Sequence, residues 1–67
     1  MTTEKIIETI KENKERYLKE ASIARVKLQA NMKDMTAQQI QQDMLFISDM
    51  ESRSYCLFLL LEEIEEA

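Results

Sequence analysis

The sequence contains no glycine and no proline, the two residues that most often interrupt a helix. Without glycine, the chain cannot form the glycine-rich loop that binds the phosphates of nucleotides. Histidine is also absent, and the single cysteine, Cys56, can form neither a zinc site of the usual kind nor an internal disulfide. The local sequence therefore favours long uninterrupted helices, and these kinds of metal and phosphate site are excluded.

A hydrophobic segment long enough to cross a membrane is missing as well. The apolar run at residues 55–61 is far shorter than the about 20 apolar residues of a bilayer-spanning helix. The N-terminus does not carry the basic and then apolar stretch of a secretory signal peptide. We therefore expect a cytoplasmic protein without membrane insertion, made of one small domain over residues 1–67, whose core is marginal unless the chain assembles with something else.

Each half of the chain is poor in charge of one sign. Residues 1–33 hold eight of the nine basic side chains against five acidic ones, a net charge of +3. Residues 34–67 hold eight acidic side chains against Arg53 alone, a net charge of −7. The two halves should attract each other if they fold together. The total charge of −4 is unfavourable for a nucleic-acid partner, because contacts with phosphates supply most of the affinity for it.

What the sequence does contain is the pattern of two helices joined by one short turn. We predict a first helix over about residues 3–30, capped by Thr2 or Thr3, and a second helix over about residues 37–65, with a turn between them at about residues 31–35. A connection this short returns the chain antiparallel. The predicted fold is therefore all-α, an antiparallel two-helix hairpin of the coiled-coil type.

The turn and the start of the second helix carry their own signals. Asn31 is expected to end the first helix in a left-handed conformation, which asparagine tolerates better than other residues with a side chain. Residues 36–39, Thr-Ala-Gln-Gln, match a capping box, in which the threonine and the second glutamine each bond the other's backbone amide. Met35 and Ile40 flank the box as a hydrophobic staple does. These signals place the start of the second helix directly after Thr36.

Apolar residues recur at spacings of three, four and seven along the first helix, as on the buried side of an amphipathic helix. This stripe includes Ile6, with Ile7 and Leu18 at its edge. For the second helix we place the facing stripe with a helical wheel of about 100° per residue. The predicted core of the hairpin consists of Ile10, Tyr17, Ala21, Leu28, Ile40, Met44, Ile47, Phe58 and Leu61.

The second helix has more apolar surface than the first helix can cover. Large apolar side chains occupy a second sector of its wheel, and each contributes about 1.5–3 kcal/mol when a partner buries it. Cys56, inside the apolar run, is expected to be a small buried side chain. Association should therefore be part of folding. The predicted partner-binding residues are Phe46, Met50, Leu57, Leu60 and Ile64.

The carboxylate pairs Glu62–Glu63 and Glu65–Glu66 are the candidates for acid–base chemistry in this sequence. They lie at the expected end of the second helix, where no concave pocket would surround them. Their simplest interpretation is solvated charge. We therefore predict a protein that is not an enzyme and has no catalytic residue, bound metal or cofactor.

Three segments resemble a known family of bacterial proteins. They are Ala-Arg-Val-Lys-Leu at residues 24–28, Thr-Ala-Gln-Gln-Ile-Gln-Gln at residues 36–42 and the apolar residues 57–61. In this order they resemble the small helical-hairpin co-chaperones of type III secretion needle subunits, over residues 21–62. The resemblance implies that the hairpin binds a larger helical-repeat (TPR-like) chaperone, and that the two proteins keep the needle subunit monomeric in the cytoplasm before export.

Two other functions remain open at this point. One is a homodimeric four-helix-bundle regulator that binds RNA, in which phosphates would be contacted by the lysines at positions 5, 11, 14, 19 and 27. Glutamates interleaved on the same helix and the net negative charge oppose this function. The other is a small phage or plasmid inhibitor that occupies a groove of a host protein. A homodimer of the chain alone is also compatible with the apolar surplus of the second helix.

Overall fold

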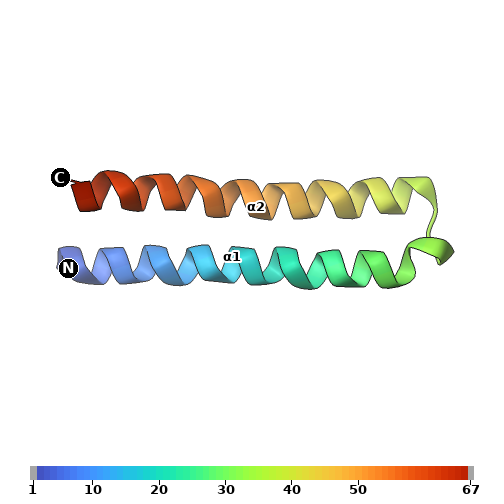
Figure 1. Ribbon diagram of the computed structural model, residues 1–67, viewed down its shortest axis with the longest axis horizontal. Coiled ribbons are helices and arrows are strands. Elements are labelled where there is room, and N and C mark those ends of the chain that lie inside the picture. Colours follow the sequence, from blue (N-terminus) through green and yellow to red (C-terminus); the bar gives the residue numbers. More distant parts are fainter. Residues whose placement is uncertain (1, 67) are drawn as a thin grey trace.

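The computed structural model describes residues 2–66 as two long helices packed side by side. Helix α1 spans Thr3–Asn31, a 3-10 helix η1 spans Met32–Asp34, and helix α2 spans Ala37–Glu66. The two long helices run antiparallel along their whole length, so that both ends of the chain lie at the same end of the molecule (Figure 1). The resulting rod measures 48 × 15 × 14 Å. The predicted all-α hairpin is confirmed, and each long helix extends one residue past its predicted end.

Both helices begin where a threonine side chain satisfies a free backbone amide. The Thr2 hydroxyl accepts a hydrogen bond from the backbone amide of Lys5 at 3.3 Å. At the start of α2, the Thr36 hydroxyl accepts from the backbone amide of Gln39 at 3.2 Å, and the Gln39 side chain accepts from the amide of Thr36 at 3.0 Å. These two reciprocal bonds are the capping box predicted from the sequence, which is therefore confirmed.

The turn does not use the left-handed residue that was expected at Asn31. Asn31 has φ −111° and ψ 1°, and no residue of the described range 2–66 has a positive φ. Its side-chain amide instead donates to the carbonyl of Lys27 at 2.9 Å. The chain then tightens into η1, closed by a hydrogen bond from the Met35 amide to the Met32 carbonyl at 3.3 Å. Because a 3-10 turn needs only ordinary negative φ values, the hairpin reverses direction without glycine.

The contact between the helices follows a strict heptad, with side chains at alternating spacings of three and four residues. The side chains of α2 that are buried or half-buried lie at positions 40, 43, 47, 50, 54, 57, 61 and 64. The matching positions of α1 are 7, 10, 14, 17, 21, 24 and 28, with Asn13 half-buried beside them. This is the a/d pattern of a coiled coil, and we call these positions the seam.

The seam corrects several residues of the predicted core. Met44 and Phe58 were expected in the core, but they are 58% and 43% exposed. Met50 was expected to face a partner, but it is 7% exposed and packs with Ala21, Leu28 and Ile47. The cause is the helical period: a wheel for a straight helix drifts by about 20° per heptad from the 3.5-residue repeat of a coiled-coil seam.

Other predicted core residues do lie on the seam. Ala21, Leu28, Ile47 and Leu61 are buried, and Ile10, Tyr17 and Ile40 are half-buried. On α1, Ile7 rather than Ile6 occupies the seam, because Ile6 is one position outside the heptad and remains exposed. The core is thus a single row of contacts between two helices.

A polar layer interrupts the apolar seam near its middle. Ser54 is the one buried polar residue of the described chain, and its hydroxyl donates to the backbone carbonyl of Lys14 at 3.3 Å. The Lys14 side chain, at a seam position of α1, extends out of the contact until its Nζ lies 5.7 Å from the centre of the Phe58 ring. This geometry keeps the ammonium group near solvent and leaves Phe58 partly uncovered.

Candidate protein-binding surface

Ion pairs between the helices flank one side of the seam. Lys11 pairs with Glu65 at 3.7 Å, and Arg25 pairs with Glu51. These residues are separated by two heptads on each helix, and they match α1 to α2 in one antiparallel register. Because all four side chains are about half exposed, each pair contributes only a few tenths of a kcal/mol up to about 1 kcal/mol.

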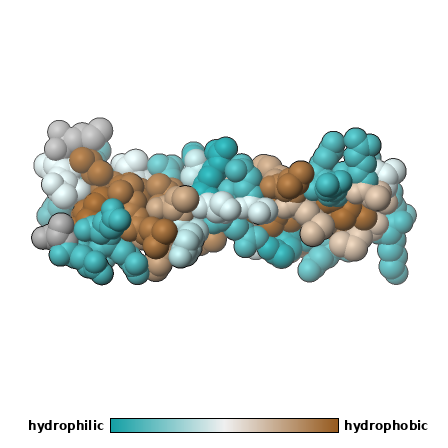
Figure 2. Space-filling view, turned by 90° about the horizontal axis from the view of Figure 1, so that it is seen from above, coloured by the Kyte–Doolittle hydropathy of each residue, from teal (hydrophilic) through white to brown (hydrophobic). Residues whose placement is uncertain are grey.

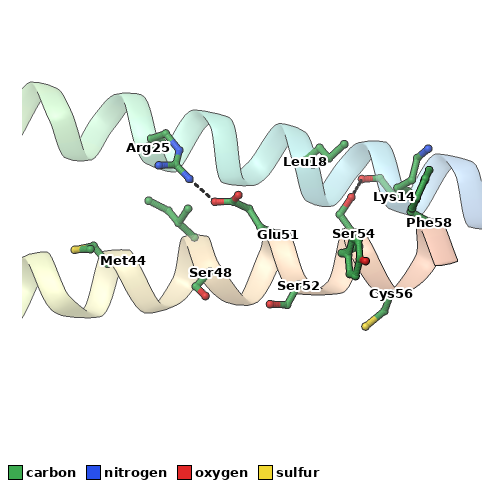
Figure 3. A pocket seen from close by; sticks show the side chains of 12 residues that line it. Lys14, Leu18, Arg25, Met44, Ser48, Glu51, Ser52, Ser54, Cys56 and Phe58 are labelled. Carbon is green, nitrogen blue, oxygen red and sulfur yellow. Dashed lines mark hydrogen bonds and ion pairs between the residues drawn. The ribbon is translucent and has the colours of Figure 1, made fainter.

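On the same side, an open groove of about 900 Å³ runs along the junction of the two helices. In Figure 3 the Arg25–Glu51 pair bridges the helices, and Ser54 points to the backbone at Lys14. Ser52 and Cys56 point away from α1. The groove is lined by Lys14, Leu18, Arg25, Met44, Ile47, Ser48, Glu51, Ser52, Ser54, Tyr55, Cys56 and Phe58.

The opposite side of the seam carries aromatic and cationic side chains. Arg53 pairs with Asp49 at 3.1 Å, and its guanidinium lies 5.8 Å from the centre of the Tyr17 ring. Arg16 lies 5.3 Å from the same ring. Interaction with the Tyr17 side chain, followed by the Asp49 carboxylate, raises the pKa of Arg53 above its ordinary value. Tyr17 and Asp49 thus hold Arg53 on this side of the seam, and Asp49 neutralises its charge.

The outer surface of α2 carries most of the exposed apolar side chains of the described chain. Figure 2 looks onto α2 and shows apolar side chains gathered toward both ends of the rod, with polar side chains between them. We call the group near the C-terminus of α2 the end patch. It consists of the exposed residues Tyr55, Phe58, Leu59 and Leu60.

A second apolar group lies near the turn and is called the turn patch. Its exposed members are Met44 and Leu45, which line an open hollow of about 560 Å³ with Ala37 and Ile40. Leu45 is 63% exposed. Leu45 and Leu59 are 14 residues apart, which separates the two patches by about 21 Å along the helix.

The structure divides the five predicted partner-binding residues into three groups. Phe46 and Leu60 are exposed, Leu57 and Ile64 are half-buried in the seam, and Met50 is in the core. The prediction missed Leu45, Leu59 and Tyr55, which a wheel with the 3.5-residue repeat of a coiled coil would have placed outside the seam. Cys56 is also exposed rather than buried, because it lies on the side of α2 away from α1.

The lysines considered for RNA binding do not form one basic face. Lys11 is held by Glu65, and Lys14 lies over Phe58 on the same side of the hairpin. Glu12 and Arg16, four residues apart on α1, form no ion pair among the described residues, since Arg16 lies over the Tyr17 ring. On a wheel of about 100° per residue, the five lysines spread over about 220°, more than half of the helix circumference, and they are not aligned for contact with a phosphate backbone.

Within residues 2–66, no group of three or more histidine, cysteine, aspartate and glutamate side chains is placed to hold a metal ion. No helix in this range combines the length and the apolar character that crossing a bilayer requires. The groove and the hollow described above are not lined by the glutamate pairs near the C-terminus. The notable surface of the described chain is therefore the uncovered apolar side of α2.

Comparisons of the chain with protein-family models, with curated proteins and with solved structures found no match.

Proposed function

We propose that this protein is a non-catalytic helical hairpin that binds a larger helical protein through the outer surface of α2. The resemblance of residues 24–28, 36–42 and 57–61 to the needle-subunit co-chaperones suggests the specific role. In that role the partner is a helical-repeat chaperone, and the complex keeps a type III secretion needle subunit monomeric in the bacterial cytoplasm before export.

The observation that supports this proposal most strongly is the uneven exposure of the two helices. Seven of the twelve large hydrophobic residues that are exposed in the described chain lie on α2. Soluble monomers rarely leave large apolar patches uncovered, and such patches mark sites of association. The residues of α2 that carry it are Met44, Leu45, Phe46, Tyr55, Phe58, Leu59 and Leu60.

The small core of the hairpin supports the same function. Five apolar side chains are buried in the described chain, and even these keep a few per cent of their surface exposed. A single row of contacts between two helices is marginal in a chain of this size, which has no disulfide to help it. A partner that covers α2 would therefore add a large share of the stability of the folded protein.

The test is co-expression of the full chain with a helical-repeat chaperone and a needle subunit of a type III secretion system from the same bacterium. We expect the chain and the repeat protein to co-elute in size-exclusion chromatography with light scattering, and the needle subunit to join them as a monomer. Leu45→Gln and Leu59→Gln, which make both patches polar, should together remove the chain from the complex.

Val26→Gln is the matched control, because Val26 lies on α1 and is 63% exposed, the same fraction as Leu45. This variant should bind as the wild type does. Recovery of the chain alone as a stable monomer in the presence of the repeat protein would exclude the proposed function. If Val26→Gln lost as much binding as the combined Leu45→Gln and Leu59→Gln variant, α2 would not be the binding surface.

A further inference from the structure

The end of α2 has one turn that is apolar on every side. Consecutive residues of a helix are about 100° apart, so residues 57–61 surround the helix axis. Leu57 and Leu61 face α1, since Leu57 is half-buried and Leu61 is buried. Phe58, Leu59 and Leu60 lie between them on the wheel and are all exposed. These three side chains span an arc of about 200°, of which α1 reaches only the edge at Phe58, through the Lys14 side chain.

An arc of this width is too large for one partner helix. The apolar stripe by which a helix packs against a neighbour is about 100° wide. A single helix laid against α2 would cover Leu59 and only one of its two neighbours. Complete burial of Phe58, Leu59 and Leu60 requires two helices, one on each side of α2, which form a groove between them.

The charges beside this turn indicate what the edge of that groove must offer. Glu62, Glu63 and Glu66 follow the end patch directly. Among the ion pairs of residues 2–66, Glu65 is matched by Lys11, but none of these three glutamates takes part in one. Across residues 37–66, seven carboxylates stand against the single guanidinium of Arg53, which Asp49 already neutralises. A partner that encloses this end without cations would desolvate carboxylates that have no counter-charge.

The same glutamates are unfavourable in the free hairpin. Helix α2 has no basic residue in its last turn, and carboxylates there face the negative end of the helix dipole. Their charge therefore destabilises the isolated protein and can become favourable when an external cation approaches. This is a second reason, independent of the apolar arc, to expect positive charge on the partner.

A second copy of the chain is a poor occupant for this surface. Each copy has a net charge of −4, and residues 37–66 carry a net charge of −6. Packing two end patches together would place Glu62, Glu63 and Glu66 of the two copies near each other, where like charges repel. The chemistry of the surface fits a different protein with opposite charge.

We propose that the end of α2, from Tyr55 to Glu66, inserts into a groove between two helices of the partner, and that the edge of this groove is lined with lysine or arginine. The apolar arc enters the groove, and Glu62, Glu63 and Glu66 pair with the basic edge. This inference rests on the proposed function and specifies the site and the chemistry of its partner.

Photo-crosslinking tests the two-helix groove in the complex of the full chain with the co-expressed helical-repeat protein. Phe58 and Leu60, on opposite sides of the arc, are replaced one at a time by p-benzoylphenylalanine. We expect their crosslinks to map to two different helices of the repeat protein. The same replacement at Glu12, on α1, should give no crosslink. Crosslinks from both positions to one helix, or to a second copy of the chain, would overturn the proposal.

Charge removal tests the basic edge. The triple variant E62Q/E63Q/E66Q should weaken binding about tenfold and reduce its salt dependence, while its melting temperature when free should rise by a few degrees because the unfavourable charges at the helix end are gone. The matched triple E8Q/E12Q/E15Q removes the same charge from α1 and should change the affinity less than about twofold.

If the two triple variants changed the affinity for the repeat protein equally, the basic edge would be overturned. If Leu59→Gln weakens binding and E62Q/E63Q/E66Q does not, the basic edge would also be overturned, but the proposed function would stand. Failure to recover any complex with the repeat protein would instead remove the proposed function on which this inference rests.

Discussion

At the residue scale, the hairpin separates pairs of similar side chains into different environments. Met44 and Met50 are six residues apart on α2, yet Met44 is largely exposed and Met50 is in the core. Phe58 and Leu61 differ in the same way, although both belong to the same apolar run. The position within the heptad, rather than hydrophobicity, decides which side chain stabilises the free hairpin and which remains free for a partner.

This difference gives a prediction for two methionines. Met50→Ala should lower the free energy of unfolding by about 2–3 kcal/mol, because it leaves a cavity beside Ala21 and Ile47. Met44→Ala should change it by less than about 0.5 kcal/mol, because its side chain touches little in the free protein. Urea denaturation followed by circular dichroism measures both values. Similar losses for the two variants would contradict the register of α2.

At the element scale, the sequence was sufficient for the helices and their starts, but not for the rotation of α2. The capping box at Thr36 was predictable because its bonds are local and involve residues three apart. The rotation of α2 depends on how two helices wind about each other, which no single helix encodes. Asp43 on the seam of α2 also obscured the heptad, because a search for apolar residues passes over it.

The capping box at the start of α2 supports a prediction of its own. Thr36→Ala should lower the free energy of unfolding by about 1 kcal/mol, because the backbone amide of Gln39 loses its acceptor. Thr3→Ala, at an exposed position next to the cap of α1, should have an effect below about 0.5 kcal/mol. Chemical denaturation of both variants under the same conditions gives the comparison. A cap that contributes nothing would leave the Thr36 variant as stable as the control.

The ion pair between Arg25 and Glu51 can be tested by exchanging its charges. Arg25→Glu would bring a second carboxylate next to Glu51 and should destabilise the hairpin by about 1 kcal/mol or less, since both side chains are half exposed. The double variant R25E/E51R should recover most of the loss. Thermal melts at low and high salt measure the coupling, which salt should weaken. If the stability changes of R25E and E51R simply added in the double variant, the two side chains would not interact in solution.

At the scale of the whole molecule, the hairpin is a rod with one thin row of core contacts and a large apolar surface on one arm. The ion pairs and the polar layer at Ser54 fix how the arms meet but contribute little stability. The apolar side chains that would add more stability are directed away from the core. The uncovered apolar surface of α2 is therefore a property of the whole arrangement, which the excess of apolar residues in α2 made predictable even though the individual residues were not.

Stability of the whole molecule should therefore depend on its partner. The free chain should melt at low temperature in a broad transition, and saturating helical-repeat protein should raise its melting temperature, because a ligand that binds only the folded state stabilises it. Circular dichroism and amide hydrogen exchange of the free and bound chain measure the difference. Strong amide protection over α2 in the free protein would contradict this expectation.

The reversal at residues 32–36 has a consequence for how freely this protein can change. Since no residue in the described range has a positive φ, the hairpin bend places no demand on any one amino acid with respect to backbone handedness. A library that randomises positions 32–34 without proline should yield mostly folded variants. Evolution could therefore vary the tip of this molecule, and with it any contact made there, while the paired arms stay intact.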